Sequence, residues 1–220
     1  MSQKIKLFGV VAVVAFLSYR TAVTTHASRD GMEGPSVTAD GVLFHAGLNS
    51  HSDTDPEFYG VIEGSVTFMA NIDFQKVKEH MLDPGVLGQI SPLVSEYTAT
   101  KTLENEDVLT YAVEETIAPL PQMGNGEPAK AWLNFHVNKR ALADDTIAVT
   151  FELDKEKPNK WARLSGRIYG LDLHNGYSMF MVASSSKSHY EARPSDRIFL
   201  VREYLKSTKD QIVDWLNSIN

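Results

Sequence analysis

The sequence predicts an α+β fold, in which a curved antiparallel β-sheet of about seven strands wraps around one long C-terminal helix. The first observation behind this prediction is a run of segments between residues 59 and 185 that alternate apolar and polar side chains and are separated by turn residues. The second is an apolar stripe at helical spacing within residues 194–220. A wide stripe on a long helix needs a partner surface of matching length, which the sheet provides.

The first predicted strand, 59–70, is followed by two short helices. Asp73 stands where an N-cap belongs, directly before a helix at 74–82 whose apolar residues recur at helical spacing. An Asp-Pro-Gly sequence at 83–85 ends this helix, and we expect the second short helix at 86–90.

Six further strands follow, bounded by turn residues. Asn175-Gly176 is a strong signal for a two-residue hairpin, and residues 104–107 mark another turn. Hairpin connections between successive strands predict an antiparallel meander. The predicted strands are 94–103, 108–117, 130–138, 146–153, 161–173 and 177–185.

The last element is a helix of about six turns. Pro194 suits its first turn, with Ser195 and Asp196 beside it. Its apolar residues recur at intervals of three, four and seven, so they form one stripe. The stripe consists of Ile198, Val201, Leu205, Ile212, Trp215 and Ile219.

The N-terminus predicts export. Residues 1–27 have the layout of a signal peptide: a short basic start, an apolar run at 7–17, and small residues before a cut after Ala27. The apolar run is too short to cross a membrane, which takes roughly 20 residues. We therefore expect a periplasmic or secreted protein. An uncleaved membrane anchor stays open as the alternative, because Arg20 is atypical before a cut site.

Between the signal peptide and the domain at 58–220 lies an irregular lead-in segment, residues 28–57, rich in Gly, Ser, Asp and His. His51, Asp53 and Asp55 could ligate a metal by type, but their spacing fits no known site. The sequence therefore predicts no metal site and no cofactor.

Charge and cysteine content exclude several classes of function. The net charge is −7, and without residues 1–27 there are 18 Lys and Arg against 28 Asp and Glu, a net of −10. An acidic domain is a poor partner for nucleic acid, because phosphate contacts need Lys and Arg. The absence of cysteine excludes disulfides, thiolate metal sites and cysteine nucleophiles.

The region 59–220 resembles the START-like, or helix-grip, superfamily, which includes polyketide cyclases and dehydrases, lipid transport proteins and coenzyme Q-binding START proteins. The resemblance lies in the order of elements rather than in an invariant motif. It is carried by the segments GVIEGSVTFMANI, DFQKVKEHMLDP, ISPLVSEY, WARLSGRIYG…NGYSMFMVAS and RIFLVREYLKSTKDQIVDWL.

The resemblance implies an elongated apolar cavity between the sheet and the terminal helix, filled in relatives by lipids, sterols, isoprenoids or polyketides. We therefore expect a carrier or sensor of a hydrophobic small molecule or lipid, with transient membrane contact for ligand exchange. No catalytic residue is assigned. The candidate ligand-binding residues are Tyr111, Phe135, Phe151, Ile168, Met179, Met181, Val201 and Leu205.

Two alternatives stay open. One is a cyclase or dehydratase-type enzyme that uses Tyr111, Glu114 or His136 in the same cavity; the other is an interaction module with a filled core. Glu114 and Glu115 are neighbours in one strand, so they lie on opposite faces and one of them faces inward. We favour a solvated strand end for both.

Arg163 and Arg167 alternate with Leu164 and Ile168 in a predicted strand. If the two apolar residues point inward, both arginines point to solvent. Recognition of an anionic head group by either arginine would require the opposite register.

Overall fold

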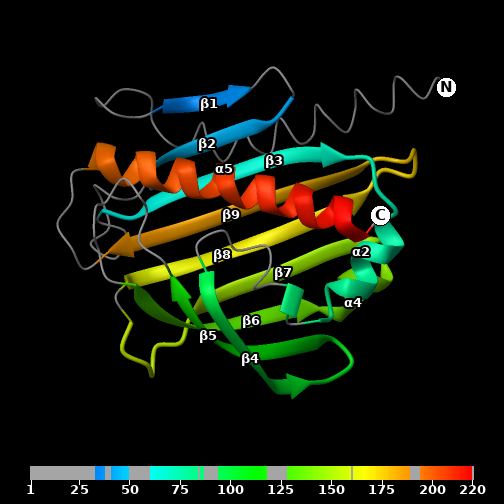
Figure 1. Ribbon diagram of the computed structural model, residues 1–220, viewed down its shortest axis with the longest axis horizontal. Helices are drawn as coiled ribbons and strands as arrows, with labels where there is room; N and C mark the ends of the chain where they lie inside the picture. The colour runs from blue at the N-terminus through cyan, green and yellow to red at the C-terminus, as the bar shows by residue number, and fades with distance from the viewer. Residues whose placement is uncertain are drawn as a thin grey trace.

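The protein is described from a computed structural model that places residues 33–37, 41–49, 60–83, 85–86, 94–117, 128–159, 161–188 and 194–219. Within these residues, nine strands form one antiparallel sheet, and a long C-terminal helix lies across one face of it (Figure 1). The strands lie in the order β1-β2-β3-β9-β8-β7-β6-β5-β4. The predicted α+β architecture is confirmed.

The elements follow the chain in a simple order. Three strands precede the first described helix, and six strands and one short helix separate it from the terminal helix. The bounds are β1 (Glu33–Val37), β2 (Leu43–Leu48), β3 (Ile62–Ala70), α2 (Phe74–His80), β4 (Val94–Glu104), β5 (Val108–Ile117), β6 (Ala129–Asn138), α4 (Lys139–Ala143), β7 (Thr146–Leu153), β8 (Trp161–Asp172), β9 (Ser178–Ser188) and α5 (Pro194–Ile219).

The strand count corrects the prediction of about seven, because β1 and β2 arise from the segment 28–57 that was expected to be irregular. β2 pairs antiparallel with β3, so it covers a backbone edge that would otherwise be open. On β2, Ala46 is buried against Ile62. The strand was missed because His45 and Gly47 interrupt its short apolar run.

Two short helices lie at the ends of strands. In α2 the predicted cap is confirmed, since the Asp73 carboxylate accepts a hydrogen bond from the Gln75 amide at 3.0 Å. The five-residue helix α4 was not predicted; the Asn138 side chain caps it by accepting from the Ala141 amide at 3.0 Å. A helix this short has no readable periodicity. Of the predicted helix 86–90, residues 87–90 lie outside the described part of the chain.

The terminal helix packs on β3 and β2 and also contacts β9 and α2. Its predicted stripe is confirmed at Leu205, Ile212 and Trp215, which are all buried. α5 comes close to the backbone at Gly64 of β3, where an added Cβ would lie 2.6 Å from Leu205 and 2.7 Å from Val201. Glycine is therefore required for α5 to lie this close to the sheet.

The register assigns each side chain to one of two faces. We call the face against α5 the concave face, since β4 and β5 curl forward on that side in Figure 1, and the opposite one the outer face. Gly64 is opposite Ser184, and Ser184 is opposite Gly166. Residues that are opposite one another in this way form a row across the sheet, and the side chains of one row lie on one face.

The predicted signal peptide, residues 1–27, lies outside the described residues. Among the helices that the structure does describe, none combines the length and apolar character needed to cross a membrane.

Candidate functional site

Three of the predicted ligand-binding residues form one continuous aromatic row on the concave face. Tyr111 of β5 is opposite Phe135 of β6, and Phe135 is opposite Phe151 of β7. The rings of Phe135 and Phe151 stack with their centroids 5.3 Å apart. Phe151 then continues over Gly166 of β8, where an added Cβ would collide with its ring. The row gives the interior an aromatic wall that comes from three strands, β5, β6 and β7, and reaches over β8.

Three more predicted residues also face the interior. Ile168 is opposite Val149 and Val182, and it is 7% exposed on the concave face. Val201 and Leu205 of α5 sit over Gly64, at the other side of the same face. The structure therefore brings six of the eight predicted residues to the side of the sheet that α5 covers.

Met179 and Met181 lie on the outer face, so their placement in an interior site is wrong. Strand alternation gives the concave positions of β9 to Phe180 and Val182, each 3% exposed. Met181 is opposite Thr67 and Tyr169 on the outer side. The sequence does not show which alternating set of side chains faces α5, because the segment Met-Phe-Met-Val is apolar at every position.

Glu115 is the exception to the apolar character of this face. It shares the concave phase with Tyr111 and Val113, and it is only 6% exposed. Burial raises the pKa of its carboxyl from 4.5 to about 7. No hydrogen bond or ion pair joins it to any described residue. Because Glu115 is buried, the expected solvated strand end is wrong for this residue.

Tyr97 of β4 lies directly opposite Glu115. Its hydroxyl is buried and has no hydrogen-bond partner among the described residues. Burial raises the pKa of Tyr97, and the negative charge of Glu115 adds to that rise. By contrast, the Tyr111 hydroxyl donates to the carbonyl of Leu82 at 2.8 Å. Neither Tyr97 nor the pairing with Glu115 was predicted, since the pairing depends on the register of β4 with β5.

The other candidates for enzyme chemistry point outward. Glu114 pairs with Lys130 on the outer face, and this contact lowers the pKa of its exposed carboxyl. His136 is also on that face, with its Nδ1 3.1 Å from the Thr110 hydroxyl. Arg167 is exposed there as well, while Leu164 and Ile168 take the concave phase, as predicted for inward apolar residues. None of these three side chains reaches the interior.

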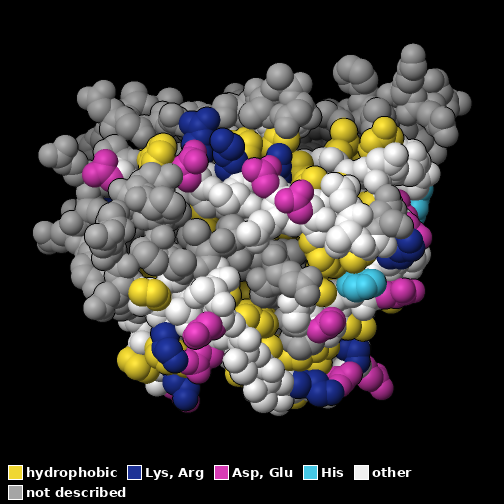
Figure 2. Space-filling model, viewed as in Figure 1, with side chains coloured by type: hydrophobic (Ala, Val, Ile, Leu, Met, Phe, Trp, Pro, Cys, Tyr) yellow, Lys and Arg dark blue, Asp and Glu magenta, His cyan; other side chains and the backbone are white. Residues whose placement is uncertain are grey.

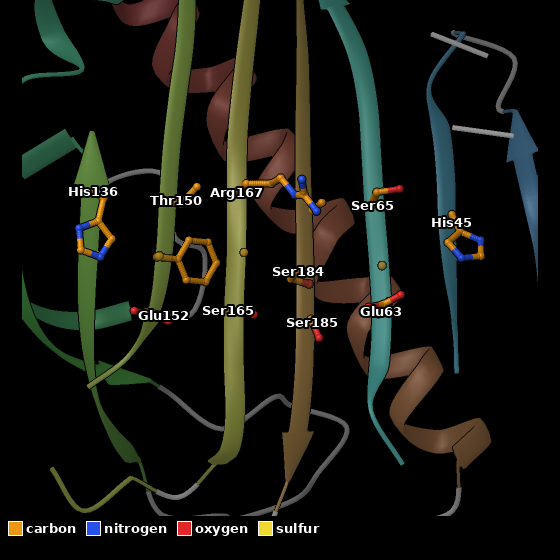
Figure 3. Close-up of a pocket in the computed structure, with 14 residues that line it drawn as sticks. His45, Glu63, Ser65, His136, Thr150, Glu152, Ser165, Arg167, Ser184 and Ser185 are labelled. Carbon is orange, nitrogen blue, oxygen red and sulfur yellow. The ribbon is translucent and has the colours of Figure 1, made fainter. Parts of the chain in front are cut away.

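A hollow of about 510 Å³ lies on the outer face, away from α5 (Figure 3). Two cross-strand rows floor it across β2, β3, β9, β8, β7 and β6, with small hydroxyl residues between larger polar ones. Most of the side chains that line the hollow carry polar groups, and it lies on the opposite face from α5, so it is not the cavity that was predicted. Its outward-facing lining includes His45, Glu63, Ser65, His136, Thr150, Glu152, Ser165, Arg167, Ala183 and Ser185.

Within the described part of the chain, two buried polar atoms at this hollow have no hydrogen-bond partner, His45 Nδ1 and Ser185 Oγ. Burial lowers the pKa of His45, and the nearby Glu63 carboxylate opposes that shift. Glu63 itself accepts a hydrogen bond from the Asn49 amide at 2.6 Å. The sequence offered no signal for this hollow, because its residues come from six strands.

No group of three metal-ligating side chains is present among the described residues. His51, Asp53 and Asp55 lie outside them.

Figure 2 shows the side of the molecule that carries α5. Acidic and basic side chains run along the helix and along the edge near β4, and hydrophobic side chains are exposed between these two bands. On this side of the molecule, hydrophobic side chains are therefore visible between two charged bands.

This architecture has counterparts among solved structures. No protein-family model matches the sequence, and no curated protein matches it. Solved structures do match. The human StAR-related lipid transfer protein 5 aligns with a TM-score of 0.61 at 11% identity over 99% of each chain. A STAR-related lipid transfer protein from Xanthomonas axonopodis aligns with a TM-score of 0.60 at 12% identity, over 86% of this chain and 99% of that one.

The chain has the START-like helix-grip fold. A third structure with this fold, the Zhui aromatase/cyclase from a Streptomyces species, aligns with a TM-score of 0.51 at 10% identity, over 72% of this chain and 93% of that one. Both lipid transfer proteins and a cyclase thus share the helix-grip fold with this chain. At these identities the likeness concerns the fold, and activity has to be argued from the residues.

Proposed function

We propose that this helix-grip protein binds a hydrophobic small molecule between the concave face of its sheet and α5, and acts as its carrier or sensor. The aromatic row Tyr111–Phe135–Phe151 and Ile168 supply an apolar wall, and Val201 and Leu205 supply part of the opposite side. Ligand sites are mostly apolar with a few placed polar groups, and this interior has that composition. The lipid transfer proteins of the same fold support the proposal.

The observation that carries the proposal is the pair Glu115 and Tyr97. A core that merely fills itself avoids unpaired polar groups, because burying one without a hydrogen bond costs about 1–3 kcal/mol. Here the Tyr97 hydroxyl is buried without a hydrogen-bond partner among the described residues, and it lies on the strand position opposite Glu115, a residue that is only 6% exposed. A bound molecule with one polar group would satisfy both, which a filled core would not require.

Affinity would come mainly from apolar contact. Each Å² of apolar surface removed from water contributes about 25 cal/mol before the cost of ordering the ligand. The polar pair at β4 and β5 would then orient the molecule rather than supply most of its binding energy.

Native mass spectrometry of gently purified protein, followed by organic extraction, tests the proposal. We expect a co-purified apolar molecule, or, after delipidation, saturable binding of a fluorescent sterol or fatty acid. Protein that is empty and binds neither probe would overturn the proposal and would favour the interaction module with a filled core.

One observation favours a second function, an enzyme of the cyclase or dehydratase type. The pKa of Glu115, about 7, suits a general acid or base at neutral pH. Glu115 would take the role first considered for Glu114 or His136, which face outward. Turnover of an apolar hydroxyl or keto substrate that disappears in Glu115→Gln, with binding retained, would establish this function over the carrier.

We also propose that the protein is exported, on the layout of residues 1–27. N-terminal sequencing of the protein from its native host should then begin at Ser28. An intact Met1 would instead support the uncleaved anchor.

A further inference from the structure

The polar pair at β4 and β5 is surrounded by groups that carry no positive charge. Ala131 lies opposite Glu115 on β6, and Val113 precedes it on the same face. The charged and titratable groups that act on Tyr97 are Glu115, Tyr111 and Asp83. No cation among the described residues pairs with the Glu115 carboxylate.

Basic side chains near these strands are already engaged on the surface. Lys101 of β4 is exposed and pairs with Glu104 at 2.7 Å. Lys130 of β6 pairs with Glu114 on the outer face. A negative charge brought to Glu115 and Tyr97 would therefore be buried beside another carboxyl without compensation, which is strongly unfavourable.

The protonated carboxyl of Glu115 and the hydroxyl of Tyr97 are both uncharged groups that donate and accept hydrogen bonds. A protonated carboxyl donates one hydrogen bond and accepts others, and a tyrosine hydroxyl does the same. A ligand hydroxyl or carbonyl can accept from either group, and a hydroxyl can also donate in return. Glu115 and Tyr97, on adjacent strands, can therefore bind one hydroxyl or carbonyl group of a ligand together.

We propose that the interior site is selective for a neutral amphiphile whose single polar end is a hydroxyl or carbonyl group, held by Glu115 and Tyr97, and that it discriminates against carboxylates such as free fatty acids. This inference rests on the proposed function, since it names the ligand class of the same site. It makes Glu115 and Tyr97 the residues that determine specificity.

The burial of Glu115 also gives the site an expected pH dependence. Burial already raises the pKa of Glu115 to about 7 in the protein without ligand. A neutral ligand that covers the carboxyl disfavours the ionised form further. Affinity for an alcohol should therefore fall as pH rises above 7, by up to about tenfold per pH unit.

Displacement of a fluorescent apolar probe by a long-chain alcohol, fatty acid and amine of equal chain length tests the inference on the full-length protein. At about pH 8 we expect the alcohol to displace the probe at a concentration at least about tenfold below that of the acid, because the acid brings a second negative charge. Equal potency of acid and alcohol would overturn the inference. So would tightest binding of the amine, which would assign the site to a cation.

Three variants locate the effect. Glu115→Gln should keep alcohol binding at both about pH 6 and about pH 8, lose its pH dependence and admit the acid more readily, because the amide is neutral and still donates. Tyr97→Phe should weaken alcohol binding several-fold at both pH values. Glu114→Gln, on the outer face of the same strand, is the matched control and should change neither preference nor pH dependence. An alcohol preference that persists unchanged in both Glu115→Gln and Tyr97→Phe would overturn the assignment.

Failure of this inference can be told apart from failure of the proposed function. If the apolar probe does not bind at all, the proposed function falls and the inference falls with it. If the probe binds and is displaced without regard to head group or pH, the function stands and only the inference is overturned.

Discussion

Glu115 and Tyr97 face each other directly across β5 and β4 on the concave face; Glu115 is 6% exposed, and the buried Tyr97 hydroxyl has no hydrogen-bond partner among the described residues. Every other strand position near them on this face is apolar, including Val113 and Ala131. A fold that places a carboxyl and a hydroxyl together in such surroundings sacrifices stability there. Polar groups kept at that cost are candidates for function.

The cost should be visible in the pH dependence of folding. The pKa of Glu115 is raised from 4.5 to about 7 in the folded state, so the folded protein holds a proton that the unfolded chain releases. The contribution of Glu115 to the free energy of unfolding should therefore be most favourable below about pH 4.5. It should fall by up to about 3 kcal/mol between pH 4.5 and 7.

Urea denaturation of the wild type and Glu115→Gln between pH 4.5 and 8 measures this effect. The variant should lose less stability over that range, because its amide does not titrate. Glu114→Gln should follow the wild type over most of the range. Parallel curves for Glu115→Gln and the wild type would contradict the burial of an unpaired carboxyl.

The contact of α5 with Gly64 predicts a steric effect. Gly64→Ala places a Cβ 2.6 Å from Leu205, so α5 must move or β3 must distort, at a cost of about 1–3 kcal/mol. Thermal unfolding of the variant measures that cost. Gly47→Ala on neighbouring β2 is the control, since the nearest atom to its Cβ is 3.7 Å away. Equal melting temperatures for the two variants would show that α5 does not pack this closely.

The two faces of the sheet should differ in ligand binding. Phe151→Ala removes a ring from the aromatic row on the concave face, and we expect it to weaken binding of an apolar probe by roughly tenfold. Met181→Ala, on the outer face, should leave the dissociation constant within about twofold. A probe titration on both variants checks this, and the reverse order of effects would move the site to the outer face.

The order of elements and most strand limits could be predicted from the sequence, because they depend on local periodicity. β5 and β7 begin and end at the predicted residues, 108–117 and 146–153. The stripe of α5 was also readable, since residues such as Leu205 and Trp215 recur at helical spacing. These features need no knowledge of how strands pair.

The site was harder to predict, because it depends on phase and register. Met179 and Met181 were placed inside because the apolar run of β9 does not reveal which phase faces α5. Glu115 and Glu114 differ only in phase, and Tyr97 meets Glu115 only through the pairing of β4 with β5. β2 escaped notice because its burial is mainly at Ala46, which is too little for a pattern.

Photo-crosslinking with an apolar probe that carries a diazirine, followed by peptide mapping, tests most directly whether a ligand binds between the concave face and α5. We expect labelled peptides from the aromatic row on β5, β6 and β7 and from α5, with labelling reduced by excess unlabelled probe. Labelling confined to the outer face, at Met179, Met181 or the polar hollow around Arg167, would contradict the account.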